Sequence, residues 1–198
     1  MAHSHRTRRG TAHPKFQAVG LPAAALIAVN VLLMYAVALT PIAYLASLAF
    51  RTPIVGLLVF GGALTAGNYL ADRGLKNEGM GLAFAGTAIL EVTYGVLGGG
   101  ILAMIASGSR VLALAVTLVV TVAMTVGIAA YVYLRGGDYS HCLFIFAGFT
   151  LRLGYEIWRV RADYAPDRSL VHALGIYVAF TGVFIHVLQI VVRLLGRR

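Results

Sequence analysis

Long apolar stretches constrain this chain more than any other sequence feature. Six of them occupy most of the chain after residue 20, and each approaches the ~20 residues needed to cross a bilayer. They cover residues 21–50, 53–71, 80–107, 111–134, 141–158 and 170–195. Inside a bilayer, backbone polar groups must be satisfied within the segment itself, and runs of this length achieve that as helices. The sequence therefore predicts an all-α fold, a polytopic membrane bundle of about six helices (six to seven).

The charge balance supports a membrane protein and excludes a nucleic-acid partner. Only 12% of the residues are charged and the mean hydropathy is +0.85, whereas soluble domains are about 25% charged. The net charge of +9 would suggest nucleic acid in a soluble protein. Here the basic residues sit mostly in tails and loops between apolar stretches, where topology and anionic lipid head groups account for them. We therefore expect the lipid bilayer as partner.

Connections between the stretches are short, which predicts a basic tail over residues 1–20 and a single transmembrane domain over 21–198. With the N-terminus inside, nine basic residues fall on the inner side and five on the outer side. This bias predicts that both chain ends are cytoplasmic, in the plasma (inner) membrane of a prokaryote. A cluster of arginines between residues 159 and 168 opposes this topology. Pro41 predicts a kink or break in the first stretch, and Arg193 lies where its side chain can extend to the membrane interface.

Ionisable residues at membrane depth are costly and are functional candidates by default. Glu91 lies in the middle of the third stretch. Two interpretations stay open for it: a protonated carboxyl hydrogen-bonded to a neighbouring helix, or a cation ligand or proton acceptor that lines a pathway. Neither interpretation needs a bound metal or cofactor.

Arg152 and Glu156 interrupt the fifth stretch, which is the weakest of the six. They are four residues apart and therefore share one helix face. They could form a purely structural ion pair. Alternatively they form a gate, because protonation of a buried carboxylate releases its cationic partner.

Histidines on the last stretch suggest a further hypothesis. His172 and His186 are 14 residues apart, which places them on nearly one helix face about 21 Å apart. No second helix carries matching histidines, so a di-haem site is excluded and a mono-haem electron-transfer subunit remains as a minor hypothesis. No nucleophile and base occur together, so we predict no enzyme.

Glycines are dense in the second and third stretches, notably at residues 98–100. Small residues let membrane helices approach closely. The alternative is a helix unwound at mid-membrane, which would expose carbonyl groups to an ion.

Several short motifs resemble the transmembrane Bax-inhibitor-motif family. The fourth stretch is followed by a short loop, Arg-Gly-Gly-Asp-Tyr-Ser at residues 135–140. Like the family's loop, it contains a basic residue, an Asp (Asp138), an aromatic residue and a Ser. Residues 146–156 are aromatic-rich and end in Tyr155-Glu156, where the family has Tyr-Asp. The last stretch contains Ile-Tyr-Val-Ala at 176–179 and ends in Leu-Gly with basic residues. The resemblance covers the second to sixth stretches.

Two departures from the family matter. The family has about seven helices, and one is missing between residues 140 and 155. Its pH-sensitive latch pairs two aspartates on a calcium leak path, and here Glu156 matches one position while Ala179 occupies the other. The resemblance implies a pH-sensitive calcium or proton leak channel, with calcium as a permeant ion rather than a cofactor. Its gate would then depend on Glu156 with Arg152 and Glu91. The alternative is a non-catalytic membrane subunit or scaffold that binds a partner protein or forms a homo-oligomer.

Overall fold

The computed structural model describes residues 13–51, 53–76, 79–135, 147–162 and 166–196. All regular structure in these residues is helical, which confirms the predicted all-α bundle. The elements are α1 (His13–Ala38), α2 (Pro41–Arg51), α3 (Pro53–Lys76), α4 (Met80–Leu102), α5 (Ser107–Arg135), α6 (Ala147–Ala162), a single 3-10 turn η1 (Pro166–Arg168) and α7 (Ser169–Leu195).

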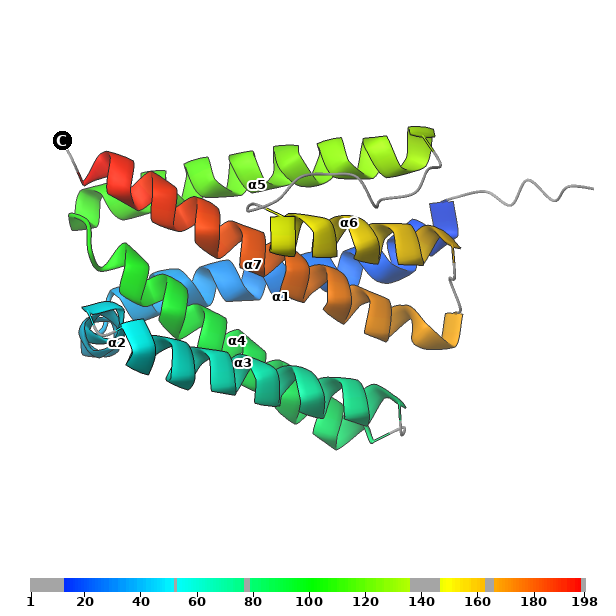
Figure 1. Ribbon diagram of the computed structural model, residues 1–198, viewed down its shortest axis with the longest axis horizontal. Coiled ribbons are helices and arrows are strands. Elements are labelled where there is room, and N and C mark those ends of the chain that lie inside the picture. The colour runs from blue at the N-terminus through cyan, green and yellow to red at the C-terminus, as the bar shows by residue number, and fades with distance from the viewer. Residues whose placement is uncertain (1–12, 52, 77–78, 136–146, 163–165, 197–198) are drawn as a thin grey trace, which may run out of the picture.

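Five of the described helices, α1, α3, α4, α5 and α7, are long and apolar enough to cross a membrane. They run alternately up and down with their axes roughly aligned, and α7 lies at the centre (Figure 1). In the most apolar segment of α7, 67% of the residues are buried inside the bundle. In the corresponding segment of α3, 12% are buried. The chain is thus an integral membrane protein organised around its last helix.

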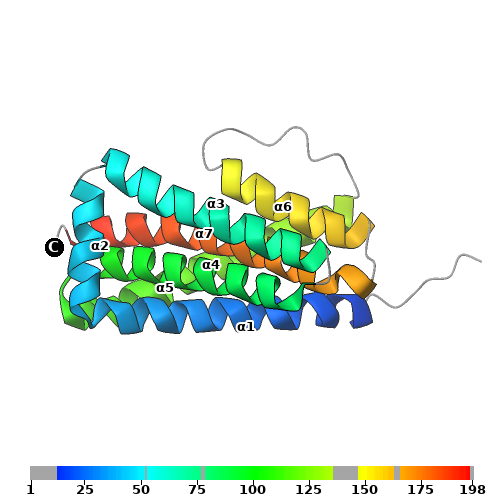
Figure 2. The same cartoon turned by 90° about the horizontal axis from the view of Figure 1, so that it is seen from below.

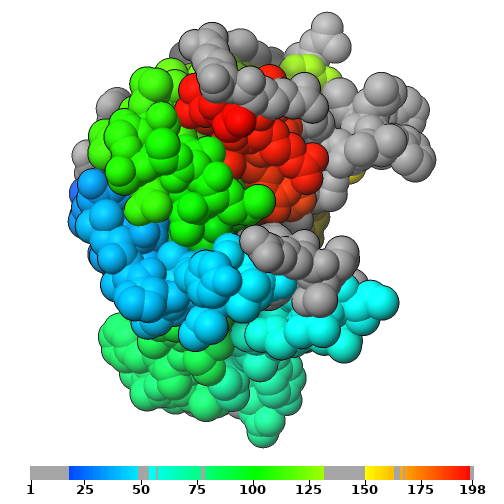
Figure 3. Space-filling model, turned by 90° about the vertical axis from the view of Figure 1, so that its left-hand side faces the viewer, coloured from blue at the N-terminus to red at the C-terminus, as the bar shows by residue number. Residues whose placement is uncertain are grey.

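The first predicted stretch is divided into two helices, as the position of Pro41 predicts. α1 ends at Ala38, and Pro41 is the first residue of α2, a position where the missing amide proton of proline costs nothing. α2 lies across one end of the bundle, nearly perpendicular to α1 (Figures 2 and 3). Its Ala43 and Ala46 are buried against the bundle, whereas Ile42 and Leu45 are exposed. The predicted break at Pro41 is confirmed.

The fifth predicted stretch differs most from expectation, because α6 is not among the five spanning helices. α6 has 16 residues, about 24 Å of helix, and four of them are charged. It begins partway along the bundle and ends where α7 begins (Figure 1). With five spans, α1 begins and α7 ends at opposite ends of the bundle, unlike the prediction that both chain ends share one side.

Glycines bring the helices together, as the packing interpretation predicts. A Cβ atom at Gly86 would overlap the backbone of Ala71 on α3, and one at Gly67 would lie 3.0 Å from Leu90 Cγ on α4. α4 continues as a helix through residues 98–100 to Leu102. A Cβ atom at Gly99 would approach Val37 of α1 to 2.6 Å. The alternative of an unwound segment at residues 98–100 is therefore wrong.

Arg110 ties the start of α5 to the end of α1. Its Nη1 donates a 2.7 Å hydrogen bond to the carbonyl of Ala38, the last residue of α1. We expect Arg110→Met to lower the free energy of unfolding by about 1 kcal/mol, because the carbonyl of Ala38 loses a charged donor. SDS-induced unfolding in micelles, followed by circular dichroism, measures this loss. The exposed Arg193, changed to Met, is the control, and an equal loss there would contradict the assignment.

Candidate functional site: a buried polar cluster

Three spanning helices meet at a polar cluster around Glu91. Asn30 of α1 donates from Nδ2 to the Glu91 carboxylate Oε2 at 2.8 Å and to the Glu91 backbone carbonyl at 3.0 Å. The same nitrogen lies 3.2 Å from the hydroxyl oxygen of Tyr177 on α7. Asn30 and Tyr177 are at most 1% exposed, and Glu91 is 8% exposed. The Asn30 amide therefore joins a carboxyl and a phenol within the core of the bundle.

The cluster contains acceptor atoms that lack donors. Asn30 Oδ1 and Glu91 Oε1 are both buried and have no hydrogen-bond partner among the described residues. Tyr94, one turn after Glu91 on α4, makes a long 3.5 Å contact with the carbonyl of Val178. Its ring packs edge-on against Tyr177 at 6.2 Å between centroids. The hydrogen-bond partners of Glu91 are all neutral, so none of them supplies a countercharge to an ionised carboxylate.

Sequence reasoning identified Glu91 but missed Asn30 and Tyr177 as its partners. Asn30 stands alone among apolar residues in the middle of the first stretch, and an amide at that depth needs a partner. The isolated position of Asn30 in the sequence could therefore have marked it as a partner for a buried polar group. Tyr177 gave no comparable signal, because an aromatic residue in an apolar helix is ordinary.

A second buried carboxylate, Glu156, lies between α6 and α7. It is 6% exposed, and a Cβ atom at Gly175 would lie 2.5 Å from its Oε2. A side chain at this position of α7 would require the carboxylate to move. Arg159 Nη1 lies 3.6 Å from Oε2. Burial raises the pKa of the Glu156 carboxyl above its usual range, while the positive charges of Arg159 and Arg152 oppose this rise.

Arg152 was expected to be the ion-pair partner of Glu156, but the ion pair forms with Arg159 instead. Arg152 and Arg159 flank Glu156 along one helix face, and the positive charges of both act on its carboxylate. Arg152 is exposed and, with Glu156, lines a polar pocket of about 310 Å³ between α3, α6 and α7. Asn68 and Asp72 of α3 form the opposite wall.

Glu91 and Glu156 do not meet. Glu91 connects through Asn30 to Tyr177, whereas Glu156 packs on Gly175, two residues earlier on α7. Two residues correspond to about 200° of rotation and 3 Å of rise. The two carboxylates therefore face opposite sides of α7.

Two of the remaining predicted residues, Arg193 and Pro41, lie apart from both carboxylates. Arg193 is exposed in the last turn of α7, and Pro41 begins α2 at the end of the bundle. Asp138 lies outside the described residues. His172 is buried, His186 is exposed with Nδ1 2.8 Å from the carbonyl of Gly182, and neither lines the polar pocket. In the described part of the chain, no group of three His, Cys, Asp or Glu side chains could hold a metal ion.

Comparison of the chain with family models, with curated proteins and with solved structures returned no match. The resemblance to the Bax-inhibitor-motif family therefore rests on the sequence motifs alone.

Proposed function

We propose that this membrane protein conducts protons across the bilayer, with Glu91 as the proton-accepting group at the centre of the path. The observation that carries the proposal is the pair of buried acceptors, Glu91 Oε1 and Asn30 Oδ1, that lack a donor. A proton on the Glu91 carboxyl supplies the missing donor. A carboxylate without it would remain deep in the bundle with no countercharge among its hydrogen-bond partners, which is costly.

Protons suit the cluster better than calcium. Calcium takes six to eight oxygen ligands, and the cluster offers the two Glu91 carboxylate oxygens, Asn30 Oδ1 and the Tyr177 hydroxyl. The resemblance to Bax-inhibitor proteins implies a leak of either calcium or protons. The proposal agrees with the second of these two ions. Calcium remains an ion to be tested beside protons.

We assign Glu156 the role of a gate near one mouth of the path. Its polar pocket lies toward the end of the bundle where α3 ends and α7 begins. Protonation of Glu156 would remove its attraction to Arg159, the partner at 3.6 Å. The neutral carboxyl is the form that burial against Gly175 favours, whereas ionisation would draw the group toward Arg159 and the polar pocket.

We further propose that this end of the bundle faces the cytoplasm. Among the described residues, seven basic positions lie at or near it, against three at the other end. The seven are Lys15, Arg73, Lys76, Arg135, Arg159, Arg161 and Arg168, the three are Arg51, Arg110 and Arg193, and Arg152 lies partway along α6. Five spans thus place the 159–168 arginines on the same side as the start of α1, which removes the conflict in the sequence-based topology.

Proton and calcium fluxes into liposomes that contain the purified protein test the proposal. We expect proton flux from the wild-type protein, and a reduction of about a hundredfold in Glu91→Gln, the usual contribution of a positioned proton-transfer group. We expect Glu156→Gln to retain flux but lose its dependence on pH. Thr93→Val is the matched control, because the Thr93 hydroxyl bonds only to the Ile89 carbonyl of its own helix.

Three outcomes would overturn parts of the proposal. Equal flux in wild type and Glu91→Gln would remove Glu91 from the path. Calcium flux that is lost in Glu91→Gln would make calcium the ion. No flux from folded, inserted protein would favour the alternative of a non-transporting subunit that binds a partner.

A further inference from the structure

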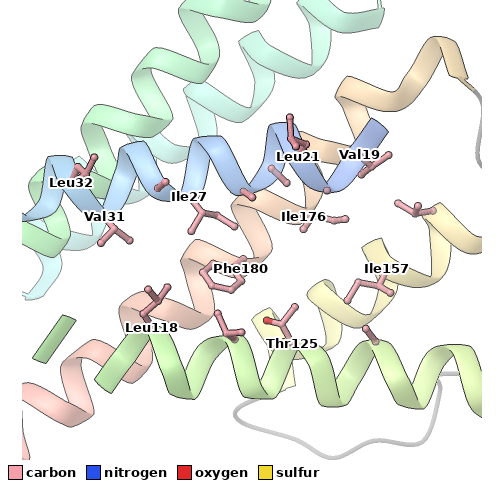
Figure 4. A pocket seen from close by; sticks show the side chains of 17 residues that line it. Val19, Leu21, Ile27, Val31, Leu32, Leu118, Thr125, Ile157, Ile176 and Phe180 are labelled. Atoms are coloured by element: carbon pink, nitrogen blue, oxygen red, sulfur yellow. The ribbon is translucent and has the colours of Figure 1, made fainter. Parts of the chain in front are cut away.

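A deep apolar groove runs along the bundle between α1 and α5, with α7 and α6 as its floor (Figure 4). Its volume is about 790 Å³. Val19 and Leu32 mark its extent along α1, and Phe180 and Ile157 contribute to the floor. Thirteen residues of helix between Val19 and Leu32 correspond to about 20 Å. The groove is therefore elongated along α1.

Small side chains on α1 create the groove. Gly20, Ala23, Ala24 and Ala28 line it, so α1 offers little side-chain volume toward α5. In water such a groove would be a hydrophobic surface in need of a partner. In this protein the groove opens beside the exposed faces of two spanning helices, which lipid surrounds.

The length and lining of the groove suit a hydrocarbon chain. The groove follows α1 for about 20 Å, comparable with the ~15 Å of hydrocarbon in one leaflet of a bilayer. Apart from Thr125 and Gly20, the residues that line it carry hydrocarbon side chains. An acyl chain from the surrounding lipid therefore matches the groove in length and chemistry.

Charge at one end of the groove specifies the head group. Ile157 and Val160 of α6 line the groove, and Arg161 lies four residues after Ile157, on the same helix face. Arg161 is exposed in the last turn of α6, at the end of the bundle that carries most of the basic residues. A cation at that position favours an anionic head group.

We propose that the groove binds one acyl chain of an anionic phospholipid from the surrounding bilayer, with its head group beside Arg161. The chain occupies the apolar floor, and the phosphate lies at the basic end of the bundle. The site is independent of the proposed proton path, because it includes neither Glu91 nor Glu156.

Native mass spectrometry tests the site with protein released from bilayers of equal phosphatidylglycerol and phosphatidylcholine. We expect the wild-type protein to retain one phosphatidylglycerol molecule in preference to phosphatidylcholine. Ala28→Phe fills the groove and should abolish retention. Ala25→Phe is the matched control, because Ala25 is exposed on the same helix but does not line the groove. Arg161→Gln should keep a bound lipid but reduce the preference for phosphatidylglycerol by about fivefold.

Retention of phosphatidylglycerol in Ala28→Phe, or no lipid preference in the wild-type protein, would overturn the proposal. A dimer that Ala28→Phe dissociates would assign the groove to a second copy instead. Circular dichroism of each variant separates loss of lipid from loss of fold, and Arg161→Gln leaves the groove packing unchanged.

Discussion

Replacing Gly86 with valine is expected to destabilise the bundle more than any other single change considered for this chain. A Cβ atom at Gly86 would overlap the amide nitrogen and Cα of Ala71 on α3. A backbone cannot rotate away as a side chain can, so α3 and α4 must separate along their contact. Overpacking typically costs about 1–3 kcal/mol and occasionally more, and we expect the upper end of that range. SDS-induced unfolding in micelles, followed by the fluorescence of Trp158, measures the loss.

Gly62→Val provides the control for this prediction. Gly62 also lies within a spanning helix, on α3, and a Cβ atom there would meet nothing within 4 Å. Both substitutions carry the same change in helix propensity, so the difference between them reports the close approach of the helices. Equal stability of the two variants would mean that α3 and α4 are not packed as described.

Loss of the Asn30 amide is expected to have the second largest effect. Asn30→Leu removes the donor to Glu91 Oε2 and the contact with the Tyr177 hydroxyl. Leaving buried polar groups unpaired costs about 1–3 kcal/mol, although hydrogen bonds between membrane helices contribute up to about 1.7 kcal/mol in measured cycles. We therefore expect a loss of about 1–2 kcal/mol in the free energy of unfolding.

A double-mutant cycle gives this prediction a distinctive signature. Asn30→Leu combined with Glu91→Leu removes the unpaired carboxyl as well, so the double variant should be more stable than Asn30→Leu alone. Additive losses would show that the two side chains do not interact. The same double variant should conduct no protons, since it lacks the proposed acceptor.

The two carboxylates illustrate what could be predicted before the structure. Glu91 and Glu156 were identifiable because a carboxyl within an apolar stretch has few explanations. Their partners were not identifiable in the same way. The partner of Glu91 lies 61 positions earlier in the chain. Glu156 pairs with Arg159 rather than with Arg152, because a difference of one helix position depends on the rotamers that packing against Gly175 allows.

The fifth predicted stretch shows how far apolarity carries a prediction. Arg152 and Glu156 already made it the weakest of the six. The described part of α6 has 16 residues, four of them charged, and is not among the helices long and apolar enough to span. Six spans would put both chain ends on one side of the membrane. With five spanning helices among the described residues, α1 begins and α7 ends at opposite ends of the bundle.

The apolar pattern predicts a helical membrane protein, Pro41 marks the interruption of its first apolar stretch, and carboxyls within apolar stretches mark costly buried groups. These properties follow from local composition, because hydropathy and proline geometry act within one segment. Packing of the helices, in contrast, sets the central place of α7, the contacts of Asn30 with Glu91 and Tyr177, and the groove that small residues on α1 leave beside α5. These properties depend on which helices pack together. Hydropathy does not distinguish one apolar helix face from another, so the contacts between them cannot be read from the sequence.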